Sequence, residues 1–131
     1  MAAAMVQLHW YLAWAMLLAA FVSGAAVGLR FHRTDFWGGY ASFPRRIVRL
    51  GHVALAALGM LNLLFALSLS QLHVGGPFIR VASVCLVVGS LAMPAVCFLA
   101  GWREPLRRLF VVPVAALVLA VVLVLCGGAP T

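Results

Sequence analysis

Four apolar stretches dominate this sequence and limit what the chain can fold into. They cover residues 5–29, 50–72, 78–102 and 109–126. At a rise of about 1.5 Å per residue, each can cross the roughly 30 Å hydrocarbon layer of a bilayer as a helix. Uninterrupted runs of this length exclude barrel strands, which alternate in segments of about ten residues. The sequence therefore predicts an all-α, polytopic membrane protein, with residues 1–131 forming one four-helix transmembrane bundle.

The composition and the first apolar stretch agree with this prediction. Hydrophobic residues make up 66% of the chain and charged residues 8%, which is far from the composition of a soluble domain. A secretory signal is not expected, because residues 1–8 contain no lysine or arginine. Positive charge instead follows the stretch, at Arg30 and Arg33. This order is typical of a retained helix with its N-terminus outside.

Arginine positions predict the orientation of the remaining helices. Every basic residue is an arginine, and all but Arg80 fall in the connections after the first and third stretches, at Arg30, Arg33, Arg45, Arg46, Arg49, Arg103, Arg107 and Arg108. Under the positive-inside rule these connections are cytoplasmic, so both termini and the 70–77 connection face the periplasm of a bacterial inner membrane. The net charge of +7 then indicates contact with anionic lipid headgroups rather than with nucleic acid.

The connection from residue 30 to residue 49 mixes arginines with aromatic residues around Gly38 and Gly39. Aromatic rings favour headgroup depth, and guanidinium groups favour phosphate. The sequence therefore predicts lipid or partner contact at Arg30, Arg33, Trp37, Tyr40, Arg46, Arg107 and Arg108. Three arginines in the first turn of the second helix oppose its macrodipole. An anion should offset them: a lipid phosphate, Asp35, or an acidic group of a partner or cofactor.

Packing between the helices is predicted from one amide and several small residues. Asn62 lies near the centre of the second stretch, where an unsatisfied amide would be costly. We expect it to bond to Ser90, through the hydroxyl or through the carbonyl that Pro94 leaves without its helical partner. Ala20, Gly24 and Gly28 recur every four residues and predict a face for the close approach of another helix.

Catalytic chemistry finds no support in the sequence. The only acidic residues, Asp35 and Glu104, fall in connections, so no carboxylate lies at membrane depth to hold a coupling ion. Cys85, Cys97 and Cys126 are scattered singly and are interpreted as small buried hydrophobes. We therefore predict no catalytic residue and no metal site.

The four histidines are the remaining candidates for binding a cofactor. His9 and His73 are expected near the outer surface, and His32 and His52 near the inner one. Imidazole is a common axial ligand of haem, so haem b is a candidate cofactor. Arg45, Arg49 and His52 share one helical face, where the guanidinium groups would neutralise propionates. The alternative makes His9 and His32 interfacial, His73 a loop residue, and His52 a packing residue.

Three functional hypotheses follow from these observations. The first is a non-catalytic helical subunit or interaction module of a larger energy-transducing membrane complex, whose partners are other membrane subunits or further copies of the chain. The second is a b-type haem or quinone-reactive anchor that uses His52 and a second histidine. The third is an oligomeric small-solute carrier or channel.

Overall fold

The computed structural model describes residues 2–71 and 76–127. Its long helices are α1 (Ala2–Phe31), α2 (Phe43–Gln71), α3 (Pro77–Trp102) and α4 (Val111–Gly127). Two 3-10 helices, η1 (Phe36–Gly38) and η2 (Glu104–Phe110), lie in the connections after α1 and α3. The all-α class predicted from the sequence is therefore confirmed.

Each long helix is apolar enough to cross a membrane, with η2 and α4 together forming the fourth candidate span, Glu104–Gly127. These spans indicate a small integral membrane protein, as the sequence predicted. Helix α2 begins at Phe43, ahead of the apolar stretch that starts at residue 50, so the arginines of residues 45–49 lie within the helix, as expected. The first turn of α2 includes Pro44, a residue whose fixed φ suits a helix start, and the arginines that follow it. The other bounds lie within one helical turn of those predicted.

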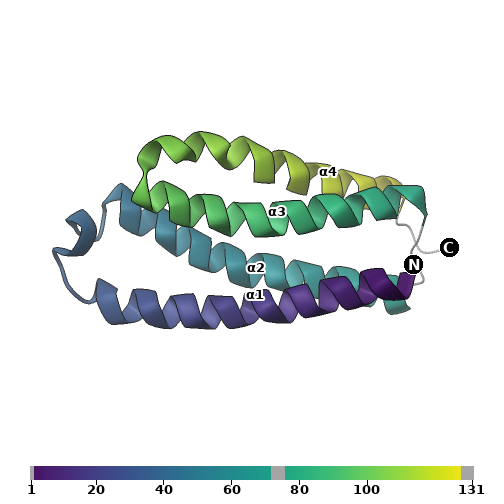
Figure 1. The fold of residues 1–131 in the computed structure, drawn as a ribbon, viewed down its shortest axis with the longest axis horizontal. Helices are drawn as coiled ribbons and strands as arrows, with labels where there is room; N and C mark the ends of the chain where they lie inside the picture. The colour runs from purple at the N-terminus through teal and green to yellow at the C-terminus, as the bar shows by residue number, and fades with distance from the viewer. Residues whose placement is uncertain (1, 72–75, 128–131) are drawn as a thin grey trace.

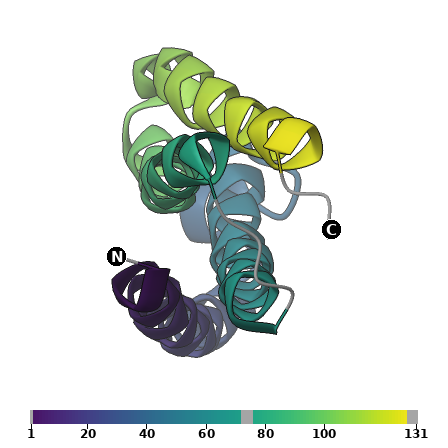
Figure 2. The ribbon, with the colours of Figure 1, turned by 90° about the vertical axis from the view of Figure 1, so that its right-hand side faces the viewer.

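The helices form an open row rather than a closed bundle. Helix α1 packs on α2, α2 on α3, and α3 on α4. An end-on view places α1 and α4 at opposite ends of this row (Figure 2). Consequently α3 is the most buried helix, whereas α1 and α4 pack through one side only.

Both arginine-rich connections lie at the same end of the molecule. Helix α1 begins and α4 ends at the opposite end, to which α2 returns and from which α3 departs (Figure 1). The up-and-down path therefore gathers eight of the nine arginines at one end, as expected for four successive membrane crossings.

Glycines mark the closest approaches between neighbouring helices. A Cβ atom added to Gly59 of α2 would lie 3.1 Å from the carbonyl oxygen of Ala13 in α1. A Cβ added to Gly89 of α3 would lie 2.5 Å from Leu117 in α4. Close backbone approach is a main source of helix association in lipid, so these glycines help to set the spacing of the row.

The small-residue face predicted on α1 is largely used inside the chain. Ala20 is buried, and Gly24 lies against the ring of His52, where an added Cβ would come within 2.7 Å of Cε1. Gly28, the last residue of this face, has open space where a Cβ atom would be added. Gly24 therefore contributes to α1–α2 packing rather than to a surface kept for a partner.

Candidate functional site

A buried cluster of polar side chains joins three helices. We call it the polar network; its members are His9 of α1, Asn62 of α2, and Ser83 and Ser90 of α3. His9, Asn62 and Ser90 have no exposed surface, and Ser83 is 4% exposed. The network therefore links α1 and α3, which otherwise contact each other little.

The hydrogen bonds of the polar network can all be formed by a neutral His9 ring. Asn62 Nδ2 donates to Ser90 Oγ at 2.7 Å and to the Leu58 carbonyl at 2.8 Å, which leaves Asn62 Oδ1 as an acceptor. His9 Nδ1 lies 2.6 Å from that oxygen, and His9 Nε2 lies 2.7 Å from Ser83 Oγ. A neutral imidazole protonated at Nδ1 satisfies both contacts, with the Ser83 hydroxyl donating to Nε2. Both ring nitrogens of His9 are thus occupied.

The position of His9 corrects the interfacial placement considered from the sequence. Its ring is fully buried and meets Phe65 edge to face, with ring centroids 4.6 Å apart. Helix α1 begins at Ala2, so His9 lies about two turns inside it, and the packing of α1 on α2 brings its ring to Asn62. The sequence pointed to Ser90 as the partner of Asn62, and the structure shows that bond, but the role of His9 and Ser83 was missed.

Arg45 organises the opposite end of the molecule. It is 2% exposed, and its guanidinium donates to the carbonyls of Phe36, Phe31 and Arg33. The rings of Phe31 and Phe36 cover it, with centroids 5.0 and 5.8 Å from the guanidinium carbon. These carbonyls belong to the end of α1 and the segment after it, so Arg45 holds the α1–α2 connection against α2.

Arg49 and His52 also make contacts within the chain. Arg49 donates to the carbonyls of Arg45 and Tyr40 and stacks on the Tyr40 ring at 4.4 Å. His52 is half-buried, with Nδ1 3.2 Å from Ser23 Oγ of α1. The shared helical face expected from the sequence thus serves the connection and the α1–α2 contact.

The other predicted contact residues lie at the surface of the arginine-rich end. Arg30, His32 and Arg33 line one open pocket at the end of α1. The side chains of Trp37, Tyr40, Arg46 and Arg108 are exposed. Arg107 forms an exposed ion pair with Glu104 at 2.9 Å, a contact of little energetic weight.

Haem ligation by His9, or the pairing of Arg45 with haem propionates, would require rearrangement. Iron at His9 would displace Asn62 or Ser83, and propionates at Arg45 would displace three carbonyls. His73, the second outer histidine of the haem hypothesis, lies outside the described residues. Within residues 2–71 and 76–127, no three His, Cys, Asp or Glu side chains gather into a group able to hold a metal ion. The contacts of His9 and Arg45 therefore support structural roles for these two residues.

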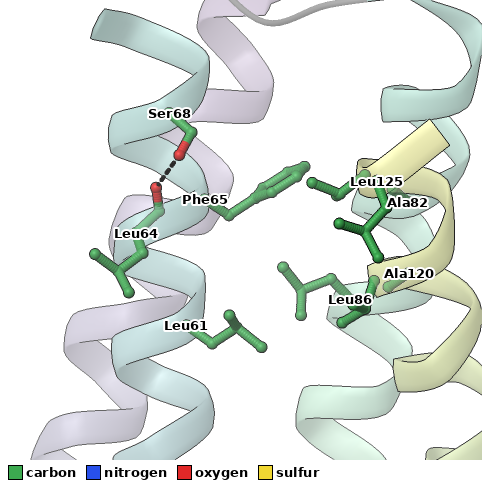
Figure 3. A pocket seen from close by; sticks show the side chains of 10 residues that line it. Leu61, Leu64, Phe65, Ser68, Ala82, Leu86, Ala120 and Leu125 are labelled. Atoms are coloured by element: carbon green, nitrogen blue, oxygen red, sulfur yellow. Dashed lines mark hydrogen bonds between the residues drawn. The ribbon is translucent and has the colours of Figure 1, made fainter. Parts of the chain in front are cut away.

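An apolar cavity of about 230 Å³ lies between α2, α3 and α4 (Figure 3). Leucines, alanines and valines line it with Phe65, and its one polar residue, Ser68, bonds to the Leu64 carbonyl of its own helix. Phe65 separates this cavity from the polar network, because its ring contacts His9 and also lines the cavity. The cavity offers hydrocarbon contact and no catalytic group.

Comparison with models of protein families, with curated proteins and with solved structures finds no match of any of the three kinds.

Proposed function

We propose that this protein is a non-catalytic helical subunit of a larger membrane complex, which supplies packing surface to other membrane subunits or to further copies of itself. The observation that carries the proposal is the open row of helices, in which α1 packs mainly on α2 and α4 mainly on α3. The polar network supports the same function, since its side chains bond to one another and to the backbone of α2.

The outer face of α1 is the more specific of the two free faces. It exposes Tyr11, Trp14 and Phe21 beside the small residues Ala15 and Ala19. Bulky rings beside small side chains form the ridges and grooves that helix packing in lipid requires. Helix α4 instead carries a uniform surface of Val, Leu and Ala, which suits contact with lipid. We therefore assign the subunit contact to α1.

Extraction in a mild detergent, followed by native mass spectrometry, tests this assignment. The protein should run as a complex larger than a monomer. Ala19→Trp should dissociate that complex by blocking close approach at α1, whereas Val118→Trp on the exposed face of α4 should leave it intact. A monomer under all conditions would contradict the proposal, and dissociation by Val118→Trp alone would move the contact to α4.

An absorption spectrum of the same preparation separates this function from that of a haem anchor. Protein purified from cells well supplied with haem should show no Soret band if His52 serves packing against Ser23 and Gly24. A Soret band that disappears in the His52→Ala variant would contradict the packing role and favour the b-type haem hypothesis.

A further inference from the structure

The arginines of the α1–α2 connection differ in whether their charge is engaged. Arg45 and Arg49 donate to carbonyls and lie against aromatic rings. Arg30 and Arg33 are exposed, and within the described part of the chain their guanidinium groups make no hydrogen bond or ion pair. Asp35, the one acidic residue of this connection, forms no ion pair with a described arginine. The guanidinium groups of Arg30 and Arg33, like that of exposed Arg46 in the first turn of α2, are therefore available to an external anion.

Arg30 and Arg33 share one pocket. The pocket has a volume of about 440 Å³ and is lined by Leu29, Arg30, His32, Arg33 and Phe36. Arginine and histidine supply several N–H donors, and guanidinium groups bind phosphate oxygens in pairs. Leu29 and Phe36 add an apolar wall. The pocket thus combines phosphate-binding groups with a surface for hydrocarbon.

Arg45 removes an electrostatic obstacle to binding an anion here. The pocket lies at the C-terminal end of α1, where the macrodipole places partial negative charge that would repel a phosphate. The buried guanidinium of Arg45 donates to the carbonyl of Phe31, the last residue of α1, and to those of Arg33 and Phe36 beyond it. Its positive charge offsets the partial negative charge at the end of α1. Its hydrogen bonds hold the backbone that carries Arg30 and Arg33.

The location of the pocket decides which phosphate compound it suits. Arg30 lies in the last turn of the apolar helix α1, the depth at which lipid headgroups meet the hydrocarbon layer. A phospholipid can place its phosphate on the two arginines and its glycerol and upper acyl carbons on Leu29 and Phe36. We propose that Arg30, His32 and Arg33 form a binding site for the phosphate of an anionic phospholipid, with Arg45 as a positioning residue.

Lipid binding to the purified protein tests the proposal. The detergent-solubilised chain is titrated with phosphatidylglycerol and with phosphatidylcholine, and bound lipid is counted by native mass spectrometry. The double variant Arg30→Gln, Arg33→Gln should bind phosphatidylglycerol about twenty-five-fold more weakly, at a factor of about five for each arginine near an anionic surface. The matched control is Arg103→Gln, Arg108→Gln, which removes the same charge from the other arginine-rich connection. Its affinity should change less than about twofold, since it leaves the pocket intact.

Three results would overturn the proposal. An equal loss of affinity in both double variants would show diffuse attraction to net charge. If inorganic phosphate bound as tightly as phosphatidylglycerol, the site would be a phosphate site with no contribution from the lipid. If phosphatidylcholine bound with equal affinity, the site would not select anionic lipids. If the glutamine variant fails to fold, Arg30→Lys, Arg33→Lys replaces it. This variant keeps the charge but loses bidentate geometry, so it should still weaken binding; unchanged affinity would contradict the site.

Discussion

At the scale of single residues, the polar network shows how one imidazole can be accommodated within apolar helices. His9 satisfies both ring nitrogens on partners from two other helices, Asn62 and Ser83. Removing one partner leaves the polar group of the other without a hydrogen bond in surroundings without water. Removing both leaves an apolar contact. The energy of the network should therefore be strongly non-additive.

A double-mutant cycle on His9 and Asn62 measures this coupling. Both single variants, His9→Leu and Asn62→Leu, should destabilise the fold, and the double variant should lose less than their sum by about 1 kcal/mol. Unfolding in a denaturing detergent titration gives the three free energies. Ser68→Ala is the control, since that hydroxyl bonds only within α2, and it should cost less than about 0.5 kcal/mol. Strict additivity would argue against a coupled network.

Arg45 is the second residue whose role can be isolated. Lysine keeps the charge but cannot direct several N–H groups to the carbonyls of Phe31, Arg33 and Phe36 at once. Arg45→Lys should therefore lower stability by roughly 2 kcal/mol and loosen the connection. Limited digestion with trypsin should then cut faster after Arg30 and Arg33. The exposed neighbour provides the control, Arg46→Lys, and the same digestion rate in both variants would exclude the organising role.

At the scale of secondary-structure elements, glycines hold the helix pairs close and a proline is tolerated. Gly59 and Gly89 set the α1–α2 and α3–α4 approaches. Pro94 lies inside α3, which continues through it to Trp102. The connection after α1 turns with positive φ at Trp37, Gly38 and Gly39. A tryptophan in this conformation is strained, and the stacking of its ring on Phe36 at 5.2 Å helps to offset the cost.

Substitution of two glycines distinguishes contact within the chain from an open surface. Gly59→Leu should push α1 from α2 and cost about 1–3 kcal/mol, because the new side chain meets the backbone of Ala13 and the Cβ of Met16. Gly28→Leu should leave the fold intact, since nothing lies within 4 Å of a Cβ there. Thermal unfolding in detergent compares the two, and equal stability would contradict the packing described for Gly59.

Helices were predictable from the sequence because apolar length alone determines them, and Asn62 could be paired with Ser90 because a lone amide in lipid needs a partner. The place of His9 was not predictable in the same way. It depends on how α1 packs lengthwise against α2 and α3, which brings the His9 ring to the level of Asn62 and Ser83. Helical spacing predicted that Arg45 shares a face with His52. The carbonyls that accept hydrogen bonds from Arg45, however, belong to a connection without periodicity. Spacing within one helix cannot reveal such partners.

At the scale of the whole molecule, the open row and the placement of arginines define two distinct ends. One end carries eight arginines and both 3-10 helices, whereas the other carries the start of α1 and the end of α4. From this asymmetry we predict an orientation in which the arginine-rich end faces the cytoplasm.

Reporter fusions test this orientation. A cytoplasmic reporter inserted after Gly39 or Glu104 should be active, and a periplasmic reporter fused after Thr131 should be active as well. The physical reason is the attraction of loop arginines to the cytoplasmic side. Exchange of the two reporters at each position is the control. A periplasmic signal from Gly39 would reverse the orientation and place the pocket of Arg30 and Arg33 in the outer leaflet.

The row also implies an order of assembly during synthesis. Each helix packs on the one made just before it, so the fold can grow by addition as the chain leaves the ribosome. His9 emerges first and has no polar partner until α2 brings Asn62, and Ser83 completes its bonding when α3 enters. Helix α4 arrives last and adds nothing to the network. A nascent chain that ends after Trp102 would already contain every hydrogen-bonding group that His9 contacts.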